Sequence, residues 1–116
     1  MPTLETIIQR AKATGIPVAH NEFVDTKQNP APDPPFICWL SSEKQRGSDD
    51  KNRIREIAAS LELYTDRKED PELENQIENE VLYDVEFQKY QAKIEDENMV
   101  QTAYDFNVIQ KIGKEK

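Results

Sequence analysis

The sequence predicts an α+β fold, in which a mainly antiparallel sheet has two helices packed on one face, in the order α-β-β-β-α-β-β. Two segments have the apolar spacing of amphipathic helices, and five have the alternation or the continuous apolar run of strands. Most connections between them are short, which favours antiparallel neighbours. A chain of 116 residues has room for one core, so we expect a single domain over residues 1–116.

The N-terminal segment is predicted to form a short amphipathic helix followed by a short edge strand. Thr3 can cap the helix, its apolar side chains recur every three or four residues, and Gly15 can end it. The segment from Ile16 to Phe23 contains Pro17, which suits an edge strand because proline cannot donate a hydrogen bond to a ladder.

Two polar segments flank a short apolar run. Residues 25–35 contain four prolines among polar residues, so we expect an extended, mobile connector. Phe36 to Leu40 is continuously apolar, which predicts a strand buried on both faces. Residues 41–53 contain no apolar side chain and include Gly47, so they are predicted to form a long mobile hairpin loop.

The C-terminal half alternates between strand and helix signals. A strand is predicted from Ile54, with one inward face made of Ile57, Ala59, Leu61 and Leu63. A helix is predicted to start at Asp70 and Pro71, with outward glutamates and a single inward stripe of Leu73, Ile77 and Val81. Two further strands are predicted over Phe87 to Ile94 and Met99 to Ile109, joined by an acidic turn at 95–98, and residues 111–116 are expected to fray.

The charge of the chain argues against a nucleic-acid reader. The net charge is -8 at pH 7, and the fifteen Lys and Arg residues are scattered among 23 acids. One locally basic stretch, residues 44–55, is nearly neutralised by acidic neighbours, so nucleic-acid contact is the lesser alternative. No apolar run approaches the ~20 residues of a bilayer span, and residues 1–10 lack the features of a signal peptide, so we expect no membrane partner.

Neither catalysis nor metal binding is predicted. His20 and Cys38 are the only residues of their kinds, and Cys38 lies in an apolar run where its thiol is expected to stay protonated. The acidic pairs and turns lack the alternate spacing of a calcium loop, and no glycine-rich phosphate loop follows a strand. We therefore expect no enzyme activity and no cofactor.

The order and lengths of these elements resemble the tail terminator and tail-completion proteins of long-tailed phages. The resemblance covers most of the chain. Its points are Gly15-Ile16-Pro17-Val18 after the first helix, Pro34-Pro35-Phe36-Ile37 at the buried strand, a long polar loop, the strand 58–64, the helix Pro71 to Leu82, and a closing hairpin that ends at residues 101–106.

The resemblance implies a structural subunit that forms a hexameric ring on the tail tube, stops tube growth and joins the head connector. The implied partners are copies of itself, tube and connector proteins, and DNA that passes without specific binding. The implied location is the virion tail, assembled in the cytoplasm of a bacterial host. Under this hypothesis the polar loop is the docking element, with candidate residues Glu43, Lys44, Gln45, Arg46, Asp49 and Asp50.

Two alternatives share the same small acidic α+β character. The chain can be another phage neck component, such as a head-closure or minor tail protein. It can also be a free regulatory interaction module that stays monomeric and binds a basic enzyme.

Overall fold

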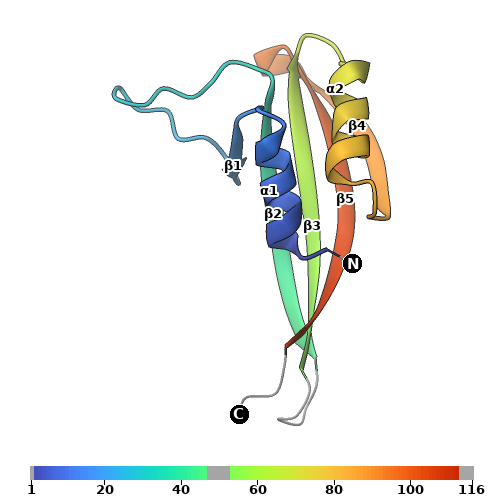
Figure 1. The fold of residues 1–116 in the computed structure, drawn as a ribbon. Coiled ribbons are helices and arrows are strands. Elements are labelled where there is room, and N and C mark those ends of the chain that lie inside the picture. Colours follow the sequence, from blue (N-terminus) through green and yellow to red (C-terminus); the bar gives the residue numbers. More distant parts are fainter. Residues whose placement is uncertain (1, 47–52, 113–116) are drawn as a thin grey trace.

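The computed structural model describes residues 2–46 and 53–112. It confirms the predicted α+β fold: five strands form one sheet in the order β1-β2-β3-β5-β4, with helices on one face (Figure 1). The elements along the chain are α1 (Leu4–Ala13), β1 (Val18–His20), β2 (Phe36–Arg46), β3 (Arg53–Asp66), α2 (Pro71–Gln76), a π-helical turn (Ile77–Val81), β4 (Phe87–Ile94), a 3₁₀ turn (Glu95–Glu97) and β5 (Met99–Ile112).

Strand β1 pairs in parallel with β2, whereas the other three strand pairs are antiparallel. A parallel neighbour requires the chain to travel back along the sheet before the next strand begins. Residues 21–35 make this return without helix or strand and project away from the sheet, and we call them the arm (Figure 1). The predicted irregular connector over residues 25–35 is therefore confirmed, while its mobility stays a prediction.

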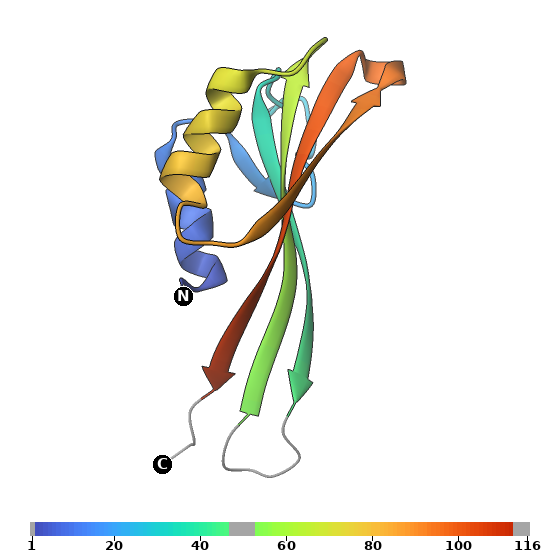
Figure 2. The ribbon, with the colours of Figure 1, turned by 90° about the vertical axis from the view of Figure 1, so that its right-hand side faces the viewer.

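The helices lie together on one face of the sheet, and within residues 2–46 and 53–112 no helix covers the opposite face (Figure 2). The alternation predicted for β3 is confirmed, because its odd-numbered apolar residues are buried under the helices. Their partners in β5 are Tyr104, Phe106 and Val108, and the helices contribute Ile7, Ala11, Ile77 and Val81. The core lies between this single layer of helices and the sheet.

The caps of α1 match the prediction. The Thr3 hydroxyl accepts a hydrogen bond from the backbone N–H of Thr6, which satisfies one of the donors that a helix start leaves free. Gly15 follows the last turn with φ +87, a left-handed conformation that glycine adopts without steric cost.

The second helix also begins where the sequence predicts. Asp70 accepts a hydrogen bond from the N–H of Leu73, and Pro71 occupies the first turn. From Ile77 the α-helix gives way to a π-helical turn, so the predicted helix from Pro71 to Leu82 is not uniform. The inward stripe is confirmed at Ile77 and Val81, which are fully buried.

The predicted loop over residues 41–53 is wrong for its first part. Residues 41–46 continue β2, and β3 begins at Arg53. The prediction relied on the lack of apolar side chains, but an unbroken ladder from Phe36 opposite Tyr64 to Arg46 opposite Ile54 supplies backbone hydrogen bonds instead. The middle of the predicted loop, residues 47–52, lies outside the described residues.

The C-terminal strand is also longer than predicted. Strand β5 continues through Ile112, so the expected fraying of residues 111–112 is wrong, and residues 113–116 lie outside the described chain. Pairing with β3 along its whole length, up to Arg53 opposite Ile112, holds this end in the sheet. The predicted acidic turn is confirmed as the 3₁₀ turn, which Asn98 ends in a left-handed conformation with φ 52.

Candidate assembly surface

Three strands continue as a ribbon toward the end of the sheet that the helices leave largely uncovered. We call this ribbon the extension, and it consists of residues 41–46 of β2, 53–58 of β3 and 107–112 of β5. Figures 1 and 2 show that the helices cover the other half of the sheet. The radius of gyration, 16.1 Å, exceeds the roughly 13 Å of a compact domain of this length. At its base, Ile57 and Val108 still belong to the core, and the remainder of the extension adds surface beyond it.

Both outer strands of the extension have an open edge within the described residues. Strand β1 pairs with β2 only over residues 37–39, and β4 pairs with β5 only as far as Phe106. Beyond these points the outer backbone groups of β2 and β5 face no further strand in the described chain. Such edges are templates for pairing with another chain.

The hydrogen bonds to β1 show which residues of β2 face its open edge. The N–H of Ile37 donates to the carbonyl of Pro17, and the carbonyl of Trp39 accepts from the N–H of Asn21, both at 2.8 Å. Backbone groups alternate along a strand, so those of Ser41 and Gln45 also face outward. The backbone groups of Ser42 face β3 instead.

The face of the extension without helices carries small side chains, Ser42 and Ala58, beside one large exposed apolar side chain, Ile109. Ile109 is 57% exposed, which is unusual for so large an apolar side chain. A hollow of about 510 Å³ lies beside it, lined by Ser42, Glu43, Lys44, Glu56, Ala58, Asn107 and Ile109. This face can accept a neighbouring surface without rearranging the core.

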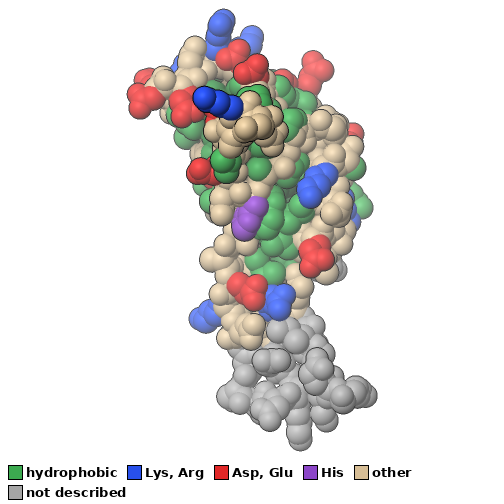
Figure 3. All heavy atoms as spheres, turned by 90° about the vertical axis from the view of Figure 1, so that its left-hand side faces the viewer, with side chains coloured by type: hydrophobic (Ala, Val, Ile, Leu, Met, Phe, Trp, Pro, Cys, Tyr) green, Lys and Arg blue, Asp and Glu red, His purple; other side chains and the backbone are tan. Residues whose placement is uncertain are grey.

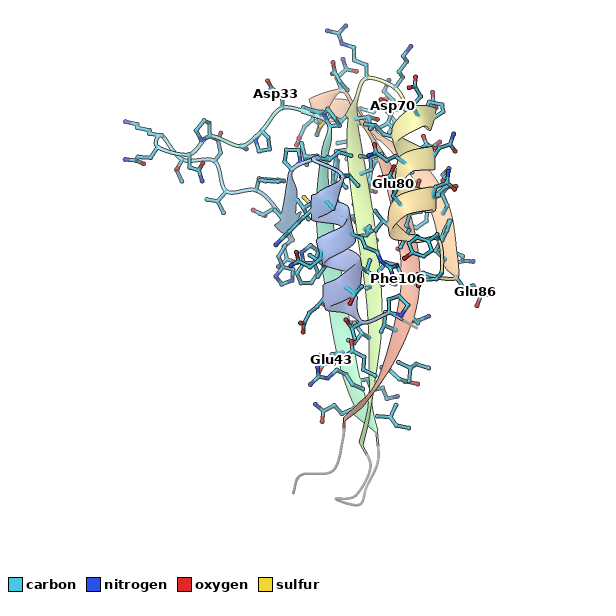
Figure 4. The ribbon with its side chains drawn as sticks, viewed as in Figure 1. Asp33, Glu43, Asp70, Glu80, Glu86 and Phe106 are labelled. Atoms are coloured by element: carbon cyan, nitrogen blue, oxygen red, sulfur yellow. The ribbon has the colours of Figure 1, made fainter. Side chains whose placement is uncertain are left out.

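The predicted docking residues divide between the extension and the part outside the described chain. Glu43, Lys44, Gln45 and Arg46 belong to β2, whereas Asp49 and Asp50 lie outside the described residues. Glu43 Oε2 lies 3.1 Å from Arg55 Nε on β3, and Figure 4 shows Glu43 on the extension. The first four candidates therefore form part of a regular strand surface. The length of the predicted loop was the signal against it, because a loop of thirteen residues is unusual for a hairpin.

The structure does not bring His20 and Cys38 together. His20 stacks on Trp39 with ring centroids 3.9 Å apart, whereas Cys38, the residue before Trp39 in β2, faces the other side of the sheet. Burial raises the pKa of the Cys38 thiol from 9.0 to about 11, with Glu62 and Glu22 adding to the shift. The thiol is therefore protonated at neutral pH, as the sequence predicts.

A polar network fixes the second helix to the sheet. Lys89 Nζ lies 2.7 Å from Glu74 Oε1 and 2.7 Å from Glu78 Oε2, and Gln91 donates to Glu74 Oε2 at 2.9 Å. The Tyr104 hydroxyl donates to Glu78 Oε2 at 3.0 Å. Glu74 is one of the glutamates that the sequence predicts to point outward from this helix, and for Glu74 the prediction is wrong, because it is only 6% exposed and faces the sheet. This network holds α2 over β4 and β5 and away from the extension.

No protein-family model matches the chain, and no curated protein matches it. Among residues 2–46 and 53–112, no helix has the length and apolar character needed to span a bilayer.

Proposed function

We propose that this chain is a structural protein of a phage or prophage tail, which caps the tail tube as a ring and helps to join it to the head connector. The observation that carries the proposal is the extension with its two open edges on different strands. Two different edges on one subunit support head-to-tail contacts, which close into a ring when the rotation between subunits permits it. The resemblance in element order to tail terminators supports the same assembly.

The strand directions fit a ring. Strands β2 and β5 are both antiparallel to β3, so they run in the same direction. Copies related by rotation about an axis along the strands therefore meet as a parallel pair of β2 and β5. Six residues, such as 41–46, offer an edge of about 20 Å, which is the length of an ordinary strand.

The proposed partners follow from this assembly and from charge. Copies of the chain form the ring, which we propose to be a hexamer, and its two ends contact tube and connector proteins. A net charge of -8 disfavours adhesion of DNA that passes through the ring. The proposed location is the virion tail, after assembly in the cytoplasm of the bacterial host.

A proline substitution tests the role of the open edge. Ser41→Pro removes an outward N–H but leaves the ladder between β2 and β3 intact, whereas the control Ser41→Ala keeps that N–H. We expect the wild type and Ser41→Ala to form rings in sedimentation velocity experiments and at tube ends in electron micrographs. Ser41→Pro should give a folded monomer, with an unchanged circular dichroism spectrum.

Several outcomes contradict the proposal. A wild-type chain that stays monomeric at micromolar concentration and leaves tail tubes uncapped would overturn it. Binding to heads that lack tails would assign the chain to another part of the neck. A stable monomer that binds a basic enzyme would make it a regulatory module.

A further inference from the structure

A cleft lies between the root of the arm and the sheet face that has no helix over it. Its volume is about 530 Å³, which is within the range of pockets that hold small ligands or side chains. Phe23 and prolines of the arm form one wall, and the ends of β2, β3 and β5 form the other. In this upper region of the molecule, hydrophobic side chains are bordered by acidic side chains and also by Lys or Arg side chains (Figure 3).

Three aromatic rings line the cleft in fixed positions. The ring of Phe36 stacks on Tyr64 with centroids 5.1 Å apart and meets the edge of Phe23 at 5.4 Å. The Tyr64 hydroxyl donates to Glu62 Oε1 at 3.0 Å and accepts from Gln101 Nε2 at 2.9 Å. These contacts fix the Tyr64 ring, and aromatic faces attract cations.

The charged residues that line the cleft all carry negative charge. Glu22 comes from the arm, Asp66 from the end of β3 and Glu97 from the 3₁₀ turn, and no Lys, Arg or His is among the described lining residues. Arg67, which follows Asp66 in the chain, has a side chain that is 75% exposed, and its Nε is 3.9 Å from Asp66 Oδ2, which is a loose contact. Burial and the nearby carboxylates also raise the pKa of Cys38 at the base of the cleft, which agrees with a negative potential there.

These acids do not form a metal site. They lie on three separate elements, and no group of three His, Cys, Asp or Glu side chains in the described chain is arranged to hold a metal ion. Separate carboxylates around aromatic faces suit an organic cation instead, because its charge is spread over a longer group.

We propose that the cleft binds an arginine or lysine side chain that a different, basic protein presents on an extended segment. The aromatic rings would contact the apolar stem and the face of the cation, and the carboxylates would pair with its N–H groups. A second copy of this chain is expected to bind in the cleft less tightly than a basic protein, because each copy carries a net charge of -8 and copies repel one another on average. This inference does not depend on the proposed ring, since the cleft can be tested on the isolated chain.

The test is a titration with N-acetyl-arginine amide, followed by NMR of the labelled full chain. N-acetyl-citrulline amide is the matched neutral probe, with nearly the same shape. We expect the arginine probe to shift the signals of Met99 and Tyr64, and the citrulline probe to bind at least about threefold more weakly. Salt at 0.5 M should weaken binding of the arginine probe, because the carboxylates are accessible to solvent.

Variants of the lining residues locate the site. Asp66→Asn and Glu97→Gln together, or Tyr64→Leu alone, should weaken binding of the arginine probe by about threefold or more. The control Glu86→Gln also removes one carboxylate charge, but from a side chain that points away from the rest of the molecule (Figure 4). It should leave binding of the arginine probe unchanged. Equal binding of both probes, or unchanged binding in the double variant, would overturn the proposal. Loss of self-association in the double variant would assign the cleft to a second copy instead.

Discussion

Lys89 on β4 forms an ion pair of 2.7 Å with Glu74 of α2, whose carboxylate is almost fully buried against the sheet. The same ammonium group also contacts Glu78 at 2.7 Å. One cation therefore pairs with two carboxylates at the contact between helix and sheet. A buried charge that loses its partner is costly, which makes this pair a sensitive point of the fold.

Replacement of this cation should destabilise the protein. Lys89→Met leaves Glu74 buried without its ion-pair partner, and we expect a loss of about 2 kcal/mol in the free energy of unfolding, below the usual range for fully buried pairs because Lys89 is partly exposed. Urea denaturation measures this loss. Lys93→Met, on the same strand and face, is the control and should change stability by less than about 0.5 kcal/mol. Equal effects of the two substitutions would show that the ion pair contributes nothing.

The Tyr104 hydroxyl should contribute to stability through its hydrogen bond to Glu78. The tyrosine is fully buried, and burial is the main cause that raises its pKa, so the hydroxyl remains a donor across the accessible pH range. Tyr104→Phe should cost about 1 kcal/mol in the free energy of unfolding, since it removes one hydrogen bond and no ring contact. Tyr83→Phe is the control, because Tyr83 is 63% exposed. Urea denaturation that gives equal stability for Tyr104→Phe and the wild type would contradict this prediction.

Acid should weaken the contact between α1 and the segment that follows α2. Arg10 Nη1 donates to Asp84 Oδ1 at 2.8 Å, and this hydrogen bond is the main cause that lowers the pKa of Asp84 below its usual 3.8. A lowered pKa in the folded state means that the contribution is present above pH 3.8 and is lost as the pH falls through the folded value. Asp84→Asn should therefore lower the Tm at pH 7 and have little effect near pH 2.

Thermal unfolding of the wild type and Asp84→Asn between pH 2 and pH 7 measures this dependence. Asp96→Asn, in the 3₁₀ turn, removes an exposed carboxylate and provides the comparison. A constant difference in Tm between Asp84→Asn and the wild type across this range would show that the carboxylate does not act through its charge.

Cys38 should react slowly in the native protein. Its thiol is buried, and burial raises its pKa to about 11, so few molecules carry the reactive thiolate at pH 8. We expect a disulfide reagent to modify native Cys38 at least about 100-fold more slowly than the chain unfolded in guanidinium chloride. Absorbance of the released thiol measures both rates. Similar rates in the two states would mean that the thiol is accessible in the folded chain.

The elements that local signals encode could be predicted from the amino-acid sequence. Thr3 and Asp70 mark two helix starts because their short polar side chains satisfy free N–H groups, and these starts are confirmed. The alternation from Ile57 to Leu63 identified the buried face of β3, because a strand places successive side chains on opposite sides. The α+β class follows from these signals.

The strand lengths and side-chain environments that depend on distant partners follow only from the folded chain. Residues 41–46 lack apolar side chains, yet they form a strand because β3 supplies their hydrogen bonds. Glu74 is buried because Lys89 and Gln91, distant in sequence, lie beneath it. The cleft beside Tyr64 likewise exists only because the arm lies against the end of the sheet. A local sequence pattern does not encode such contacts, because each contact is made by residues that only the complete fold brings together.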